Sequence, residues 1–325
     1  MFTPHTLSAA LVMMIISAFC WGSWANTYKG VKNYRFELFY WDYAIGIFLI
    51  SLILGHTMGM TGNGPDNLIN NIHSTGMSNV VAALIGGALF NLANLLLVAA
   101  IDMAGLAVAF PVSIGIALVV GVVLSYILQP KGNIAFLGAG VACALIAVVL
   151  DGAAYATLPT AARSVSKKSL ITCVVSGVLM GLWAPFMTHA MTRGNPLGPY
   201  SAAIFLTLGA LLSCFVWNVY FMKHPLVGEP VSFSGFFHAP ASGHLLGLLG
   251  GFIWGIGTVF NLVAAHFTGV AISYAIGQSA PMVAALWGIF IWREFKESGP
   301  RSKWYLGMMF LFYSLAIILV ARANG

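Results

Sequence analysis

Long runs of apolar residues, separated by short polar stretches, cover almost the whole chain. An α-helix needs about 20 mainly apolar residues to cross the hydrocarbon core of a bilayer. Ten runs qualify, and they extend over Leu7 to Ala25, Leu38 to Met58, Ser78 to Ile101, Gly105 to Leu128, Ile134 to Ala154, Ser169 to Ala190, Tyr200 to Met222, Gly243 to Ala265, Val270 to Trp292 and Trp304 to Ala321. The pattern therefore predicts an all-α membrane protein with ten transmembrane helices.

One pair of these runs occurs twice in the chain. The stretch from Gly86 to Ser113 aligns without a gap with the stretch from Gly250 to Gly277. The coinciding positions are small residues, and the pairs are Gly86 and Gly250, Gly87 and Gly251, Ala100 and Ala264, Gly105 and Gly269, and Ala107 and Ala271. Each stretch predicts two helices joined by a very short turn, so a single unit is repeated.

The remaining runs also correspond, with slightly different offsets between the two halves. Their matched pairs are Gly22 and Gly181, Trp24 and Trp183, Tyr43 and Tyr200, Ile47 and Ile204, Leu137 and Leu306, and Ala147 and Ala316. An odd number of spans in each copy turns the second copy upside down in the membrane. We therefore expect two inverted five-helix repeats, residues 1–155 and 169–325, joined by a short cytoplasmic linker at 156–168.

The composition agrees with a bilayer location and excludes several classes of function. The chain of 325 residues is 60% hydrophobic and 7% charged, whereas soluble domains carry roughly 25% charged residues. The chain has no arginine-rich stripe of the kind that binds nucleic acid. It also has no phosphate-binding loop for ATP, no HExxH motif for a catalytic metal and no GxSxG motif of an esterase. The four cysteines lie inside apolar runs. We expect no cofactor, no metal and no enzymatic activity.

The basic residues give an orientation, because cytoplasmic loops are enriched in Lys and Arg. The odd-numbered loops hold eleven of the fourteen basic residues, and the even-numbered loops and the C-terminus hold only Lys131, Arg193 and Arg322. The first run has neither a preceding basic residue nor a cleavage site, so we expect it to remain as a span. The prediction is that both termini lie outside.

Polar side chains within the spans are uncharged and lie on faces that suggest a binding site. An ion in hydrocarbon requires an opposite partner, so a core without mid-span carboxylates predicts a small neutral polar solute. The predicted binding residues are aromatic, amide or hydroxyl side chains, and they are Trp24, Phe90, Asn94, Trp183, Trp254, Thr258, Asn261, Tyr274 and Gln278. The alternative for each amide is a hydrogen bond to a neighbouring helix.

Asp42 is the candidate for proton coupling. It stands at the predicted start of the second span, beside Tyr43, where partial desolvation raises the pKa of a carboxyl group. The alternative role for this residue is a helix N-cap.

Several motifs, in order along nearly the whole chain, resemble the drug/metabolite transporter superfamily. They are GSW at Gly22 to Trp24, DY at Asp42 and Tyr43, the glycine pair with Asn94, GVACALIAV at Gly140 to Val148, GLWAPF at Gly181 to Phe186 and QSAPMVAALWGI at Gln278 to Ile289. Within that superfamily the chain is similar to ureide permeases, neighbours of the glucose/ribose and L-rhamnose/proton symporters. The resemblance implies proton-coupled uptake of a small neutral solute across a bacterial inner membrane. The stretch from Tyr155 to Lys168 is short and lacks the long central loop of plant ureide permeases.

The class of solute stays open between two chemistries. Trp24, Trp183 and Trp254 suit the C–H face of a sugar, whereas Asn94, Asn261 and Gln278 suit a ureide or nucleobase with alternating donors and acceptors. Bacterial relatives without the plant loop are close to the sugar families in length, which places a monosaccharide first and a ureide or nucleobase second. A drug exporter and a non-transporting membrane scaffold are the further alternatives.

Overall fold

The computed structural model describes residues 1–325 except 33, 62–66, 159–164 and 325, and its regular elements are helices throughout the described part. Ten helices or helix pairs are long and apolar enough to cross a membrane, which confirms the prediction of ten spans. In chain order the spans are formed by α1 (Leu7–Ser23) with α2 (Ala25–Lys29), α3 (Phe36–Thr57), α5 (Met77–Ala104), α6 (Leu106–Leu128), α7 (Ile134–Ala156), α8 (Lys167–Thr192), α9 (Pro199–Cys214) with α10 (Trp217–Lys223), α12 (Ala241–Thr268), α13 (Val270–Gly277) with α14 (Ala280–Leu286), and α15 (Pro300–Arg322).

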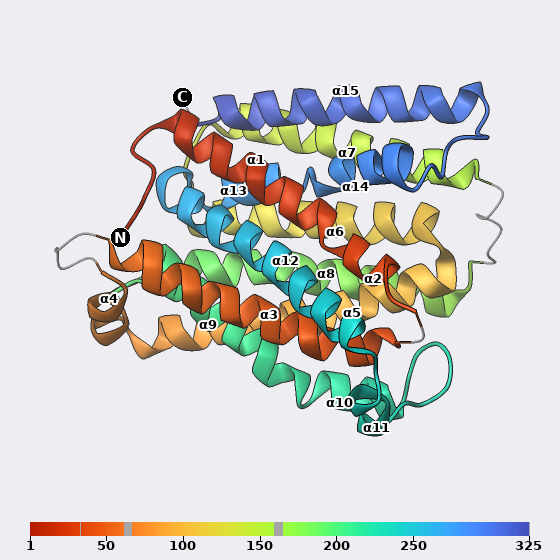
Figure 1. The fold of residues 1–325 in the computed structure, drawn as a ribbon. Helices are drawn as coiled ribbons and strands as arrows, with labels where there is room; N and C mark the ends of the chain where they lie inside the picture. The colour runs from red at the N-terminus through yellow and green to blue at the C-terminus, as the bar shows by residue number, and fades with distance from the viewer. Residues whose placement is uncertain (33, 62–66, 159–164, 325) are drawn as a thin grey trace.

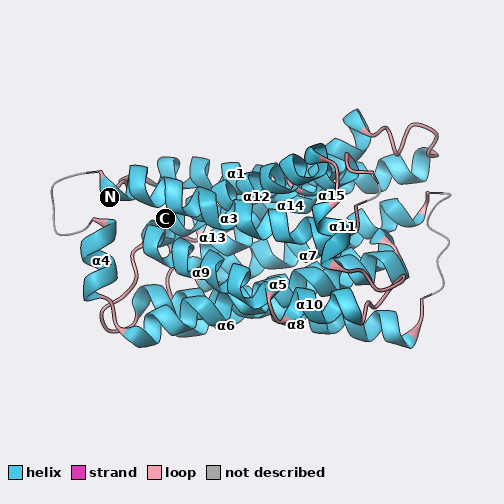
Figure 2. Ribbon diagram, turned by 60° about the horizontal axis from the view of Figure 1, so that its bottom comes forward, coloured by secondary structure: helices cyan, strands magenta, loops and turns pink. Residues whose placement is uncertain are grey.

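The long helices run side by side in a bundle with two distinct ends (Figure 1). Both chain termini lie at one end, called here the termini end, together with the short helix α4 (Leu68–Ser74). The opposite end carries α10 and the short helix α11 (Phe233–Phe237), and we call it the linker end. Figure 2 shows the same separation of the two ends after rotation. The predicted linker at 156–168 lies partly outside the described residues.

Helix contacts in the two halves are equivalent. In one set α1 packs on α12 and α3 packs on α12, and in the other set α8 packs on α5 and α9 packs on α5. The fifth and tenth spans, α7 and α15, pack on each other. If α1 is exchanged for α8, α3 for α9 and α5 for α12, the first set of contacts becomes the second. Two repeats about a pseudo-two-fold axis require this relation.

Glycines fix the register of these contacts because only a missing side chain lets two backbones approach. A Cβ added at Gly87 would meet the carbonyl of Leu206, and one at Gly251 would meet the carbonyl of Tyr43. Tyr43 is therefore the packing equivalent of Leu206 and not of Tyr200. The sequence alignment of this span is wrong by six residues, because it matched aromatic and aliphatic side chains whereas small residues determine the packing.

The turn inside each repeated unit is made by a glycine in the same unusual conformation. Gly105 has φ 77° and ψ 162°, and Gly269 has φ 89° and ψ 151°. Residues with a Cβ avoid this region. The two glycines allow α5 to turn into α6, and α12 into α13, with one residue between the helices.

Three of the described spans are interrupted: the first near its end, between α1 and α2, and two others where the sequence predicted continuous helices. The seventh span breaks between α9 and α10, and the ninth breaks between α13 and α14. A π-helical turn (η3, Trp287–Ile291) then completes the ninth span. Pro281 lies directly after the break of the ninth span and has no N–H for the helical ladder. An interrupted span leaves backbone N–H and C=O groups without helical partners, and in transporters such groups bind the ligand.

Candidate functional site

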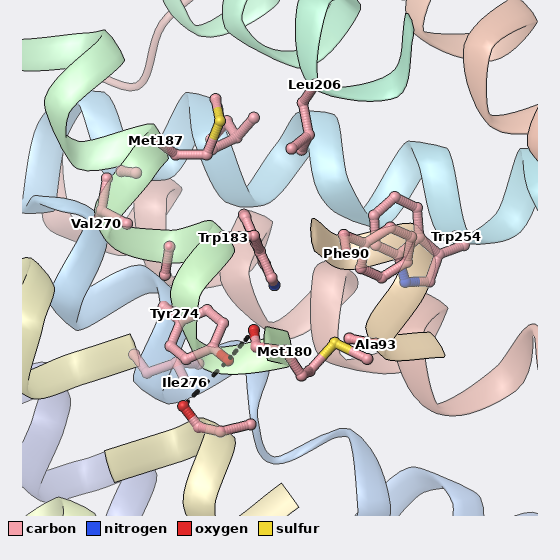
Figure 3. Close-up of a cluster of buried hydrophobic side chains, with 14 of the residues drawn as sticks. Phe90, Ala93, Met180, Trp183, Met187, Leu206, Trp254, Val270, Tyr274 and Ile276 are labelled. Carbon is pink, nitrogen blue, oxygen red and sulfur yellow. Dashed lines mark hydrogen bonds between the residues drawn. The ribbon is translucent and has the colours of Figure 1, made fainter. Parts of the chain in front are cut away.

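The predicted aromatic residues meet in the middle of the bundle. The Trp254 ring stacks on Phe90 with a centroid separation of 4.2 Å, and both side chains are buried. Trp183 meets the edge of Tyr274 at 5.4 Å. Figure 3 shows these four side chains converging from α5, α8, α12 and α13. The structure thus joins residues from both repeats in one aromatic cluster.

Trp21 connects the two parts of this cluster and was missed by the sequence analysis. Its ring stacks near Trp254 at 6.1 Å and meets the edge of Trp183 at 6.0 Å. Its indole N–H donates to the Thr258 hydroxyl over 3.1 Å. The repeat pattern gave no signal for Trp21, because the matching position in the second half is Met180.

Trp24 reaches the cluster only through another residue. It packs on Tyr43 at 4.5 Å, and Tyr43 lies 6.5 Å from Trp254. Tyr43 is fully buried, and its hydroxyl has no hydrogen-bond partner among the described residues. Since a buried polar group without a partner is costly, this hydroxyl is available to a solute.

The amide side chains differ in how far the protein itself uses them. Asn94 donates one long hydrogen bond, 3.4 Å, to the Tyr40 hydroxyl. Asn261 donates to the carbonyl of Ser273 over 2.9 Å and accepts from the Ser273 hydroxyl over 3.3 Å. Asn261, expected to contact the solute, is thus occupied in joining α12 to α13. Asn94 retains most of its hydrogen-bonding capacity.

Gln278 lies at the break of the ninth span. Its side chain interacts with the Tyr274 hydroxyl, and that hydroxyl donates to the carbonyls of Ala117 and Met180, each over 3.3 Å (Figure 3). Tyr274 therefore anchors α13 to both α6 and α8. Gly277, next to Gln278, leaves no room for a side chain beside the Trp21 ring.

Asp42 lies in the second turn of α3 and not at its cap. The N-cap is Arg35, so the alternative reading of Asp42 as an N-cap is wrong. The carboxylate accepts from the Tyr34 hydroxyl over 2.7 Å and pairs with His244 Nδ1 at 2.9 Å. Burial, together with the hydrogen bond to Asp42, raises the pKa of Tyr34. These contacts join the start of α3 to the start of α12.

Pockets open at both ends of the bundle. The pocket at the linker end has a volume of about 430 Å³ and includes Arg35, Glu37, Leu95, Val98 and Asp102 in its lining. The lining includes Leu95, the neighbour of Asn94 on α5, and does not include Asn94 itself. A second pocket of about 530 Å³ lies at the termini end, around Asn79 and His189.

Comparison with known proteins identifies the family. A sequence profile of ureide permeases matches residues 39–173 and 161–322. The chain belongs to the ureide permease family. It is therefore an integral membrane protein of a permease family, as its ten apolar helices also indicate.

This permease matches two plant ureide permeases over its full length. It is 23% identical to ureide permease 1 and 24% identical to ureide permease 2 of Arabidopsis thaliana, and each match covers 100% of this chain and 99% of the relative. A probable glucose uptake protein, GlcU, of Staphylococcus aureus is 38% identical over only 23% of this chain and 25% of its own length.

A protein of known crystal structure has a similar fold. Its TM-score is 0.62 at 17% identity, and the match covers 98% of this chain and 100% of that chain. At this identity the similarity concerns the fold alone.

Proposed function

We propose that this permease is a secondary carrier for a small, planar, neutral solute of the ureide or nucleobase class. The observation that carries the proposal is the end-to-end match to relatives named ureide permeases. The glucose uptake relative matches about a quarter of the chain. The comparisons thus favour the second of the two sequence-based solute classes, and the monosaccharide that the sequence placed first is not confirmed.

The aromatic cluster is compatible with a planar solute. Trp21, Trp254 and Phe90 present roughly parallel ring faces, at interplanar angles of 19° and 26° in the two contacts. A planar conjugated solute stacks on such faces. Asn94 supplies a donor and an acceptor on one amide, which matches the alternating N–H and C=O groups of a ureide. We therefore place the solute beside Asn94, Tyr43 and these rings.

Alternating access would proceed by movement of one repeat against the other. The pockets are suited to act as vestibules, because they open at opposite ends of the bundle. The interruption at Gln278 provides a point where the ninth span can bend without breaking a continuous helical ladder. The proposed direction is uptake, driven by protons.

Ligand-induced thermal stabilisation of the purified protein tests the solute class. Allantoin, uracil, xanthine and a set of monosaccharides should be compared, because a ligand at 100 times its Kd adds about 2.7 kcal/mol to the free energy of unfolding. We expect allantoin or a nucleobase to raise Tm and the sugars to leave it unchanged. Stabilisation by sugars alone would reverse the assignment.

Uptake into proteoliposomes tests transport itself. Labelled allantoin or nucleobase should enter vesicles that contain the protein and not protein-free vesicles. A non-transporting scaffold would show no flux for any solute of the panel, and a drug exporter would move amphipathic cations instead. Either result would contradict the proposed function.

A further inference from the structure

A second carboxyl group, Asp151, is buried inside a span that contributes no residue to the aromatic cluster. It lies in the last two turns of α7, towards the linker end, and only 2% of the residue is exposed. Its Oδ1 atom has no hydrogen-bond partner among the described residues. None of the ion pairs found in the described part of the chain includes Asp151.

The polar groups around Asp151 come from three elements. Tyr155 follows one turn later on the same face of α7, and Tyr313 approaches from α15. Both hydroxyls interact electrostatically with the Asp151 carboxyl group. Tyr155 also donates to Glu294 over 3.4 Å, and Glu294 is already paired with Lys29 at 2.6 Å. The cation of this group, Lys29, is therefore paired with Glu294 and not with Asp151.

This environment favours the neutral form of the carboxyl group. An ionised carboxylate without a cation is expensive in the apolar interior of a membrane protein, and such a group takes up a proton instead. Asp42 shows the opposite arrangement, since Tyr34 and His244 both contact its Oδ2 atom. Asp42 thus has two hydrogen-bonding partners for its carboxyl group, whereas the Asp151 Oδ1 atom has none among the described residues.

The surroundings connect Asp151 to the surface and to the solute site. Tyr155, Glu294 and Lys29 form a chain of contacts that ends at a half-exposed ammonium group. On the other side, Gly152 presses against Pro111 and the Ala107 carbonyl of α6, with no room for a Cβ. Pro111 removes the helical hydrogen bond to that carbonyl. Because α6 packs on α8 and α13, the proline position lies between Asp151 and the helices that carry Trp183 and Tyr274.

We propose that Asp151 is a proton-binding site of this permease, coupled to solute movement through the contact of α7 with the proline turn of α6. The inference rests on the proposed proton-driven uptake. The Asp151 carboxylate binds one proton when the solute site is loaded. It releases this proton and regains its negative charge when movement of α6 opens the contact between α6 and α7. Tyr155 and Glu294 provide the path at the linker end.

Infrared spectroscopy tests the proton without any solute. A protonated carboxyl group has a C=O absorption that a carboxylate lacks, so purified protein in ester-free detergent should show this band at neutral pH. The band should be absent from Asp151→Asn and retained in Glu297→Gln, which removes an exposed acid at the same end. An Asn side chain has the shape of the protonated acid, so the variant is expected to fold. An unchanged band in Asp151→Asn would overturn the proposal.

Transport in proteoliposomes tests the coupling. With an imposed pH gradient, wild-type protein and Glu297→Gln should accumulate labelled allantoin, whereas Asp151→Asn should only equilibrate it while still exchanging labelled for unlabelled allantoin. Accumulation by Asp151→Asn at the wild-type level, its loss in Asp42→Asn alone, or accumulation driven by a Na⁺ gradient would contradict the role of Asp151. If wild-type protein moves none of the solutes, the proposed function fails, and the infrared result still decides whether Asp151 holds a proton.

Discussion

The hairpins α5–α6 and α12–α13 share a glycine pattern, but they use their amide side chains differently. Asn94 on α5 makes a single long hydrogen bond, to Tyr40. Asn261 on α12 makes two, both to Ser273 on the following helix. The first hairpin thus keeps an amide available for a solute, and the second uses its amide to fasten its own two helices.

The helices after the two glycine turns differ in the same sense. α6 is continuous and contains Pro111, whereas the corresponding span of the second half breaks after Gln278. A helix that is interrupted needs other attachments to hold its first part in place. Asn261 and the doubly bonded Tyr274 hydroxyl supply them. The packing glycines are thus common to both hairpins, whereas the polar positions make different contacts in each.

Replacing the packing glycines should have the largest effect, because the shared architecture depends on them. Gly87→Ala and Gly251→Ala each place a methyl group against a backbone carbonyl of the neighbouring helix. Overpacking of this kind costs about 1–3 kcal/mol or more. We expect a large fall in Tm for both variants, measured by thermal unfolding in detergent.

Gly138→Ala is the matched control, since no atom lies within 4 Å of the added Cβ. Alanine has the higher helix propensity by about 1 kcal/mol, so this variant should be as stable as wild type or slightly more stable. If Gly251→Ala alone were tolerated, the two halves would not share the same packing requirement.

Exchanging the two amides for alanine separates binding from stability. Asn94→Ala should abolish the thermal shift produced by allantoin or a nucleobase and should lower the stability of the free protein by less than about 1 kcal/mol, because only one long hydrogen bond is lost. Asn261→Ala leaves the Ser273 carbonyl without its donor and should cost about 1–2 kcal/mol. The ligand-induced shift should survive in this variant. The reverse pattern would assign the solute contact to α12.

The architecture could be predicted from the sequence because it follows from run length and small-residue repeats. Ten spans were found, and the glycines Gly105 and Gly269 marked both turns, since one residue type alone tolerates that backbone conformation. The side-chain register of the second and seventh spans could not be found in this way. This register depends on which backbones are in contact, and an alignment of side-chain types such as Tyr43 with Tyr200 does not contain that information.

The site could be predicted in part. Phe90 and Trp254 were predicted from their spacing and Trp183 from its match with Trp24, and the three side chains lie in one cluster. Trp21 was missed because it has no aromatic mate, and the use of Asn261 by Ser273 depends on a partner twelve residues away, across a turn. Asp151 is not among the residues predicted from the sequence, because a sequence shows where a carboxyl group falls along a helix and not what surrounds it.

The smallest effect is expected at the contact that joins Trp21 of the first half to Thr258 of the second. Trp21→Phe keeps a ring in place but removes the indole donor and part of the ring, and loss of the hydrogen bond alone should cost about 0.5–1.5 kcal/mol. Thr258→Val removes the acceptor of the same bond. If the bond joins the two repeats, the double variant should cost no more than the worse single variant in a double-mutant cycle. Additive losses would show that the two side chains act separately. Met180→Leu, at the equivalent position of α8, is the matched control and should leave Tm nearly unchanged, because a Leu-for-Met exchange conserves volume and the Met180 carbonyl still accepts from Tyr274.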